Sequence, residues 1–462
     1  MKKLFILWGI LLFYAPLCLG GAPPYEANAL FAQRGEIVGD KITISDAVRL
    51  ALSDSYHIFD AQKTKEIYQS KLAEANASFY PFLSLDAAYT RALKKPPAFL
   101  SGGAMMPSTS DNVYGAGISA SYILWSGGQV RRSADLAKVS VESSIFNVLH
   151  VKDVIRQQVI RFCYDIIYSA ALIRVREEHL SVARQYLQEA QAKYKQGLVS
   201  DLDVLNQQVN VENIEPLLLQ AKKNFELGNL YLRQILNRDP EDPIYLTWTQ
   251  EDLVLPAIRS LDELYKEAIN SRPELKIAKL AVDSAYYQIK IAQSARYPVL
   301  SLNADYTYSA ATQSGLPVNS NDYYWSSSAG IKLHFPLFEG GRLAQRVTQK
   351  ELAYEQAQEA YRNKIKNVRI QVKEAWLNLN EARARIKTTQ SVVGQAKKNL
   401  SAQLERYRAG LSSRLEVNDA ISNVNNSNLQ YVQAVYDGVI SLADLELAVG
   451  GEVALYDKMA EK

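Results

Sequence analysis

Two proline-free stretches of 68 residues constrain this chain more than any other feature of its sequence. One lies between Gly128 and Gly197, and the other between Gly341 and Gly410. Because proline breaks the interior of a helix, each stretch predicts one uninterrupted helix, about 100 Å long at ~1.5 Å per residue. A helix of that length does not fit a small enzyme domain, and it predicts an elongated molecule.

Both stretches carry a regular apolar seam. Apolar residues recur at strict steps of seven in the first, and apolar or small residues at steps of three, four and seven in the second, which is coiled-coil spacing. The first seam comprises Val159, Ile166, Ile173, Leu180, Leu187 and Tyr194. The second comprises Leu343, Val347, Tyr354, Ala357, Tyr361, Ile365, Val368, Val372, Ala375, Leu379, Ala382 and Ile386. After each stretch and a short turn, a return helix is expected, at residues 201–236 and 414–449.

The chain is internally duplicated. Residues 80–90 fall on residues 297–307 at a shift of 217, and residues 194–200 fall on residues 407–413 at a shift of 213. A repeat of this length is a duplicated half rather than a solenoid unit of 20 to 50 residues. The predicted divisions are a signal peptide at 1–20, a first repeat at 21–236, a linker at 237–260, a second repeat at 261–449 and a C-terminal tail at 450–462.

Each repeat opens with predicted helices. The spacings Thr43 to Asp46 and Ser260 to Glu263 each predict a capping box at the start of a short helix. A further helix follows and ends before Pro81 in the first repeat and before Pro298 in the second, because the residue before a proline disfavours helical geometry.

Two segments of alternating apolar and polar residues follow in each repeat, which predicts strands with one apolar face. These segments are 83–89, 114–124, 300–309 and 325–335. Their lengths and their terminal aromatic residues suit transmembrane β-strands of ~9–11 residues, with a small soluble sandwich as the alternative. A membrane barrel needs at least about eight strands, so four per chain predict an oligomer.

The N-terminus reads as an export signal. Lys2 and Lys3 precede an apolar run over residues 4–19, and small residues stand where a signal peptidase reads the chain. A membrane anchor is the alternative, but the run is short for a spanning helix. Cys18 follows Pro16 and Leu17, which do not fit the small residues of a lipoprotein signal.

We therefore expect the mature chain to begin near Gly21, without a lipid. The intact mass of the purified protein measures this directly. A diacylglycerol adduct on Cys18 would contradict the assignment.

Composition argues against several functional classes. The net charge of +3 arises from 52 basic and 49 acidic residues, which is too balanced to indicate a nucleic-acid partner. The four histidines lie far apart and the two cysteines cannot form a disulfide framework. No P-loop, GxSxG or Cys-x-x-Cys motif is present, so we expect no enzyme, no metal site and no cofactor.

Three duplicated motifs together resemble the TolC family of outer-membrane efflux and secretion channels. They are a Tyr-Pro-x-Leu-Ser-Leu strand entry at 80 and 297, a Gly-Gly helix start at 127 and 340, and a Tyr-x-x-Gly-Leu-x-Ser turn at 194 and 407. The resemblance spans about residues 40–450. It implies a mainly α-helical homotrimer with a 12-stranded membrane β-barrel, four strands per chain, in contact with outer-membrane lipid. Long coiled-coil helices would form a tunnel through the periplasm, with an equatorial collar that includes residues 237–260.

The resemblance also assigns candidate functional residues at the far end of the long helices. A periplasmic adaptor, itself bound to an inner-membrane pump, would dock on the two turns. The turn residues are Gly197, Leu198, Ser200, Gly410, Leu411 and Ser413. Acidic residues would ring the periplasmic mouth and raise one another's pKa through like-charge repulsion; they are Glu416, Asp419 and Asp203. Arg414 departs from the family pattern, where an arginine sits two positions earlier.

The turns also have a purely structural interpretation. Glycine would end one helix and serine would begin the next, which leaves the leucines Leu198 and Leu411 unexplained. For the whole chain we expect an outer-membrane conduit for efflux of small molecules. Its alternatives are a protein-secretion exit duct of the type I class and a periplasmic coiled-coil scaffold or adhesin without a pore.

Overall fold

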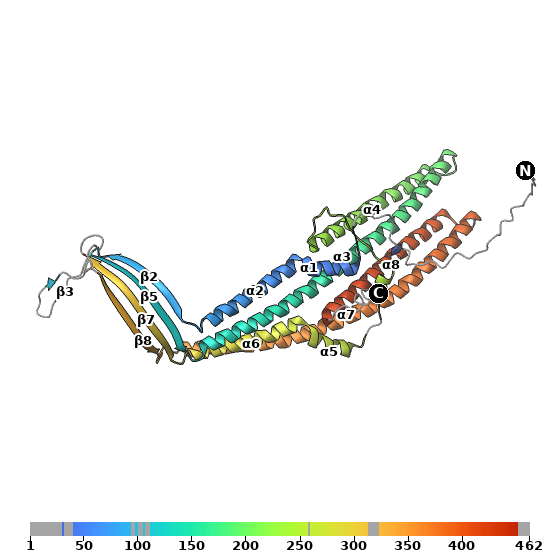
Figure 1. Ribbon diagram of the computed structural model, residues 1–462. Helices are drawn as coiled ribbons and strands as arrows, with labels where there is room; N and C mark the ends of the chain where they lie inside the picture. Colours follow the sequence, from blue (N-terminus) through green and yellow to red (C-terminus); the bar gives the residue numbers. More distant parts are fainter. Residues whose placement is uncertain are drawn as a thin grey trace, which may run out of the picture.

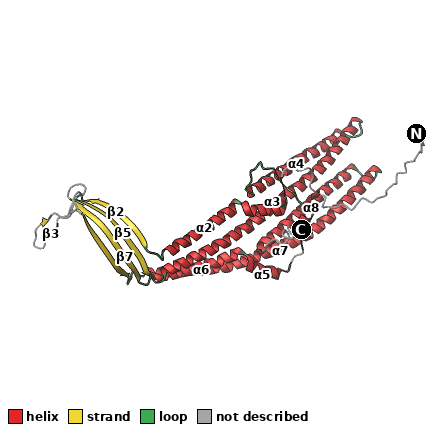
Figure 2. Cartoon of the chain, viewed as in Figure 1, coloured by secondary structure: helices red, strands yellow, loops and turns green. Residues whose placement is uncertain are grey.

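The computed structural model describes residues 30–31, 40–93, 98–99, 105–106, 111–256, 259–312 and 323–450. The predicted signal peptide and residues 451–462 of the predicted tail lie outside the described residues. The molecule is elongated, with a four-stranded sheet at one end and long helices that extend from it (Figure 1). Colouring by secondary structure separates the two parts clearly (Figure 2).

The helices of the two repeats match in order and length. Short helices α1 and α5 have 11 residues each, α2 and α6 have 22, and the long helices α3 and α7 have 67. Their bounds are Ile44–Asp54 (α1), Tyr56–Ala77 (α2), Gln129–Lys195 (α3), Asp201–Ile235 (α4), Leu261–Ser271 (α5), Pro273–Ser294 (α6), Arg342–Arg408 (α7) and Arg414–Val449 (α8). Both uninterrupted long helices and both return helices are therefore confirmed.

The four long strands form one antiparallel sheet in the order β2-β5-β7-β8. Their bounds are Phe82–Arg91 (β2), Asn112–Trp125 (β5), Val299–Thr312 (β7) and Tyr323–His334 (β8). Within the described residues, β2 and β8 are the edges of this sheet, and each has one unpaired side. The sheet is therefore open in a single chain.

The segment between β2 and β5 contains a feature that the sequence did not indicate. Two-residue strands β3 (Ala98–Phe99) and β4 (Met105–Met106) pair there in antiparallel fashion. Strands this short leave no alternation of apolar and polar residues to detect.

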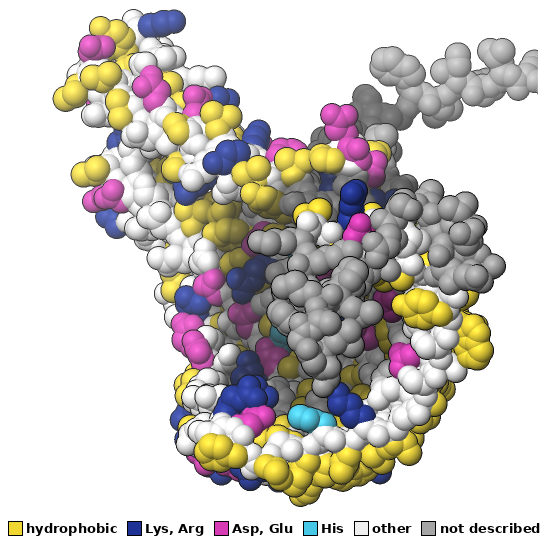
Figure 3. All heavy atoms as spheres, turned by 90° about the vertical axis from the view of Figure 1, so that its left-hand side faces the viewer, with side chains coloured by type: hydrophobic (Ala, Val, Ile, Leu, Met, Phe, Trp, Pro, Cys, Tyr) yellow, Lys and Arg dark blue, Asp and Glu magenta, His cyan; other side chains and the backbone are white. Residues whose placement is uncertain are grey.

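The sheet is apolar on its convex side and polar on its concave side. Viewed from the sheet end, hydrophobic side chains line the outer curve, whereas polar and charged groups line the hollow (Figure 3). Leu85 on β2 is 75% exposed and Ile331 on β8 is 68% exposed. On the other face, the hydroxyls of Ser84 and Ser119 hydrogen-bond across β2 and β5 at 2.6 Å. An exposed apolar belt on a curved sheet matches the requirement of a lipid-facing wall.

The linker is ordered by contacts with both repeats. Strand β6 (Ile244–Leu246) pairs in parallel with β1 (Asp40–Ile42), and a 3₁₀ turn follows at Glu251–Leu253. Trp248 Nε1 donates to the Phe31 carbonyl at 2.8 Å. Arg383 on α7 donates to the Pro256 carbonyl at 2.5 Å. These contacts fasten the linker around the middle of the helical part.

The predicted seams are buried as expected, with one exception. The seam residues of α7 are all buried or partly buried, and on α3 this holds from Val159 to Leu187. Tyr194, at the end of the first seam, is 48% exposed, because the hairpin turn follows two residues later.

One of the two predicted capping boxes is wrong. The box at Thr43 and Asp46 is present, with the Asp46 amide 3.1 Å from Thr43 Oγ1. Ser260 is the N-cap of α5, but its side chain makes no capping bond. Spacing along the chain brings the two groups within reach, but it does not fix the serine rotamer.

Candidate functional site at the helix tips

The two turns at 197–200 and 410–413 have the same backbone geometry and lie at the end of the molecule far from the sheet (Figure 1). Gly197 and Gly410 adopt φ of +71° and +70°, a left-handed conformation that favours glycine. In each turn the amide of the next residue, Leu198 or Leu411, donates to the carbonyl five residues earlier, at 3.0 and 2.8 Å. This is the Schellman motif, and each leucine directly follows its glycine.

The return helices begin with a capping box in both repeats. The amides of Asp203 and Glu416 lie 3.3 Å from the hydroxyls of Ser200 and Ser413. In return, the two carboxylates accept the amides of those serines, each at 3.0 Å. Two of the predicted mouth residues therefore also fix the start of α4 and α8.

These bonds determine the direction of the carboxylate pKa values in the single chain. The hydroxyl and then the amide of Ser200 donate to Asp203 and lower its pKa. The hydroxyl of Ser412 and then the amide of Ser413 lower the pKa of Glu416. Both shifts are opposite to the increase expected from repulsion within an acidic ring, because donors to a carboxylate favour its charged form.

Four leucines are exposed at the tips. Leu198 and Leu411 are 68% and 70% exposed, as the sequence predicted. Leu202 and Leu415 are 64% and 69% exposed, and they were not among the residues predicted from the sequence. They stand four residues after the first pair in both repeats, in the first turn of α4 and of α8. That repeated spacing was the signal that could have identified them.

The two tips are joined within the chain. Arg414 Nη2 on α8 donates to the Tyr186 carbonyl on α3 at 3.3 Å. Arg414 and Asp203 both line a cavity of about 380 Å³ between α3, α4 and α8. The structure thus brings Asp203 close to the start of α8, whereas Asp419 is exposed beside Glu416 on the same helix.

Two features are absent from the described part of the chain. It contains no group of three or more His, Cys, Asp or Glu side chains that could hold a metal ion. None of its helices combines the length and the apolar character needed to cross a membrane.

Comparison with known proteins identifies the class. The family model described as outer membrane efflux protein matches residues 47–238 and 264–451, one block in each repeat. The chain belongs to this family and is an outer-membrane protein with a TolC-like fold. Membership removes the pore-free scaffold or adhesin as an alternative.

Individual relatives agree with this assignment. The outer membrane protein TolC of Vibrio cholerae is 25% identical over 280 residues, which are 60% of this chain and 63% of that protein, so the match spans less than two thirds of its length. The pyoverdine export outer membrane protein OpmQ of Pseudomonas putida is 23% identical over 94% of this chain and 93% of its own. The CmeC outer membrane channel of Campylobacter jejuni superposes with a TM-score of 0.74 at 18% identity, covering 94% of each chain. These relatives are named as membrane, export or channel proteins rather than enzymes.

Proposed function

We propose that three copies of this chain form a non-enzymatic conduit from the periplasm across the outer membrane. The open sheet is the observation that carries the proposal. Its four strands have two unpaired edges, β2 and β8, and unpaired backbone groups are not tolerated in lipid. Neighbouring strands in the order β2-β5-β7-β8 are antiparallel, so the first and last strands, β2 and β8, also run in opposite directions. The β8 edge of one copy can therefore pair with the β2 edge of the next in the same antiparallel pattern. Three copies then close a 12-stranded barrel.

The helical part supports the same closure. Exposed apolar side chains form one stripe on α2, at Tyr56, Phe59 and Ile67. A second stripe on α7 lies on the face opposite its buried seam; it comprises Leu352, Ile370 and Leu377. The helix order is α2-α3-α6-α7, so these stripes lie on the two flanks of the chain. Contact between the α7 stripe of one copy and the α2 stripe of the next would bury both.

We further propose that the four exposed leucines at the tips dock a periplasmic adaptor, which connects the conduit to an inner-membrane pump. Such a surface suits the apolar positions of a helical hairpin on the partner. The cargo is a small molecule, with secretion of a protein as the alternative within the class. The pump, which selects the cargo, distinguishes the two.

Reconstitution into planar bilayers tests the conduit. We expect discrete ion-conducting steps with a preference for cations, because acidic residues at a narrow mouth attract them. Protein that inserts into the bilayer and gives no conducting steps would contradict the proposal.

The capping bonds predict the pH dependence of that preference. The pKa values of Asp203 and Glu416 are lowered, so both carboxylates stay charged at pH values where ordinary ones, with pKa near ~4, begin to protonate. Cation preference should therefore persist from pH 7 to about pH 5 and disappear only on further acidification. Reversal potentials across a salt gradient measure this. Loss of preference already between pH 7 and about pH 6 would indicate that repulsion within the ring outweighs the capping bonds.

A further inference from the structure

The two strand pairs β2–β5 and β7–β8 have the same register. Phe82 lies opposite Ser121 in the first pair, and Val299 lies opposite His334 in the second. The shifts found in the sequence, 217 residues for the first strand and 213 for the second, convert one pair of residues into the other. The duplication therefore holds in three dimensions, strand for strand.

One junction between repeats lies within the chain, where β5 pairs with β7; we call it the inner junction. Ser121 lies opposite Asn303 there. A ring of three copies would contain three inner junctions and three outer ones, where β8 of one copy meets β2 of the next. A ring of six similar units closes with the least distortion when all its junctions have the same geometry.

The same shifts convert the inner junction into a register for the outer one. On β8, His334 is the counterpart of Ser121. On β2, Asp86 is the counterpart of Asn303. His334 of one copy is therefore expected opposite Asp86 of the next copy.

This register keeps the two faces of the sheet intact across the boundary between copies. On the convex, apolar side it places Ile331 opposite Tyr89 of the next copy; these side chains are 68% and 55% exposed in a single chain. On the concave, polar side it places His334 opposite Asp86 (Figure 3). A slip of one residue would bring polar side chains to the apolar side. A slip of two would preserve the faces but lose the equivalence with the inner junction.

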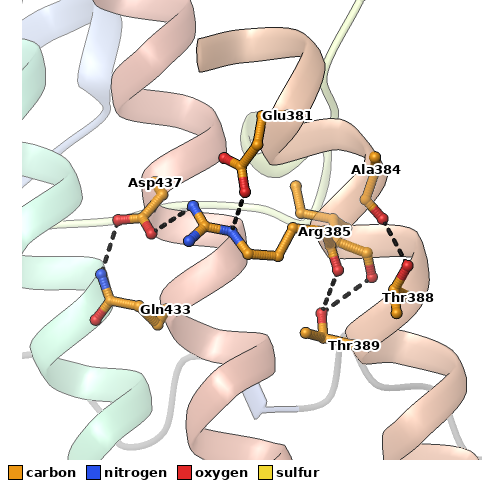
Figure 4. Close-up of polar contacts among 8 residues, drawn as sticks. Glu381, Ala384, Arg385, Thr388, Thr389, Gln433 and Asp437 are labelled. Atoms are coloured by element: carbon orange, nitrogen blue, oxygen red, sulfur yellow. Dashed lines mark hydrogen bonds and ion pairs between the residues drawn. The ribbon is translucent and has the colours of Figure 1, made fainter.

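Asp86 and His334 form no ion pair in the described part of a single chain. Both are exposed, and Asp86 accepts a hydrogen bond from the Ser84 hydroxyl at 3.0 Å. Charged groups of the helical part meet partners in the same chain, as Arg385 on α7 and Asp437 on α8 do at 2.8 Å (Figure 4). The strands β2 and β8 thus carry an acceptor and a donor that a second copy would bring together.

A second observation comes from the joint between the strands and the helices. Within the chain, Trp125 packs edge-on against Tyr297, with ring centroids 6.1 Å apart. Gly127 lies against the same tyrosine, since a Cβ atom on this glycine would stand 2.7 Å from the Cβ of Tyr297. The inner junction is therefore closely packed at this joint.

The matching aromatic contact of the second repeat is not made within the described part of a single chain. Phe338, the counterpart of Trp125, is 89% exposed. Tyr80, the counterpart of Tyr297, is 73% exposed. Gly340 has a φ of +60°, as its counterpart has +61°, but a Cβ atom on Gly340 would meet nothing within 4 Å. The two halves of this contact thus lie beside β8 and β2, at opposite edges of the chain.

We propose that copies of this chain join with the geometry of the inner junction. His334 then donates a hydrogen bond to Asp86 of the next copy. Phe338 packs against Tyr80 of the next copy. The inference rests on the proposed function as a three-copy conduit, and it names the residues that specify the boundary. Opposite residues on neighbouring strands have Cβ atoms ~5 Å apart, which suits an imidazole–carboxylate hydrogen bond. Three such pairs would face the channel.

Disulfide cross-linking between copies tests the register. The expected pairs are His334→Cys with Asp86→Cys, and Lys332→Cys with Ala88→Cys. The crossed combinations, His334→Cys with Ala88→Cys and Lys332→Cys with Asp86→Cys, use the same four positions and serve as matched controls. Opposite residues have Cα atoms ~5 Å apart, whereas residues in the crossed combinations are ~8 Å apart, too far for a disulfide. The expected pairs should form covalent dimers and trimers at least about tenfold faster.

The oxidation is performed on outer-membrane fragments, and the products are separated on denaturing gels without reductant. Cys163 is buried, so the parent protein should give no cross-link. Native mass spectrometry of the unoxidised variants shows that each one assembles.

A double-mutant cycle tests the aromatic contact. Phe338→Ala and Tyr80→Ala should each lower the temperature at which the extracted assembly dissociates. The double variant should lower it little further, because both changes remove the same contact. Ile118 on the inner strand β5 is the matched control, since it is 52% exposed and lies away from the boundary. Ile118→Ala combined with Tyr80→Ala should show the sum of the two single effects.

The contrary outcomes separate this proposal from the function on which it rests. Faster cross-linking of either crossed combination would show that the copies join in a slipped register. Assemblies of three copies in which none of the four combinations cross-links would show that the outer junction differs from the inner one. Additive effects of Phe338→Ala and Tyr80→Ala would contradict the aromatic contact. A parent protein that remains a monomer would instead contradict the proposed conduit itself.

Discussion

Replacing Leu198 and Leu411 with aspartate is expected to abolish export while the assembled protein stays in the outer membrane. Both side chains are about two-thirds exposed, so the change disturbs no core of the chain. A charge placed in an apolar docking contact costs about 2 kcal/mol or more per site, and two sites lower adaptor affinity roughly a thousandfold. Export by whole cells and site-specific cross-linking to the adaptor measure the two effects.

The second leucine pair extends this prediction. Leu202→Asp with Leu415→Asp should produce the same loss, because these side chains are equally exposed at the start of the return helices, four residues after the first pair. Leu93→Asp serves as the control, since Leu93 is 93% exposed and follows β2 at the sheet end. If export and adaptor cross-linking persist in both tip variants, the tips are turns without a docking role.

Removing the charge of Glu416 and Asp419 should raise single-channel conductance and weaken block by trivalent cations. Three copies would bring six carboxylates to one narrow ring, which attracts multivalent cations. The double variant Glu416→Ala with Asp419→Ala removes both charges, and it also removes the capping bond that Glu416 accepts from the Ser413 amide. The conductance of this variant should therefore rise for two reasons: the charge at the mouth is lost, and the first turn of α8 is no longer fixed by its capping bond.

A matched variant separates these two causes. Glu416→Gln with Asp419→Asn removes the charge, and glutamine retains the capping role at this position. It should lose the cation block as fully as the Ala variant, with a smaller rise in conductance. If both variants keep the block and the cation preference of the parent, the ring lies elsewhere, and Asp203 and Asp201 are the next residues to replace.

The long helices and the duplication were predictable because they depend on local sequence. A 68-residue stretch without proline leaves the backbone free to continue as helix, and the repeated alternation marks the strands. The dual role of Asp203 and Glu416 was less visible. Each follows a serine by three residues, which is also the spacing of a capping box, but the comparison with a known family drew attention to their charge alone.

The features between the hairpins could not be predicted from the sequence. The side-chain hydrogen bonds between α3 and α8, such as Tyr168 to Gln433 and Gln157 to Asp444, join residues 265 to 287 positions apart, and their register depends on how α3 and α8 pack. The bond from Arg414 to the Tyr186 carbonyl is of the same kind, since a backbone acceptor carries no sequence signature. Cavities likewise arise from packing rather than from composition.

The number of chains in the assembly tests the central claim most directly. Native mass spectrometry of the protein extracted from the outer membrane in detergent measures it without assumptions about shape. The account predicts three copies, because three four-stranded sheets close one 12-stranded barrel and pair every strand edge. A folded monomer, a dimer or a tetramer as the main species would contradict it.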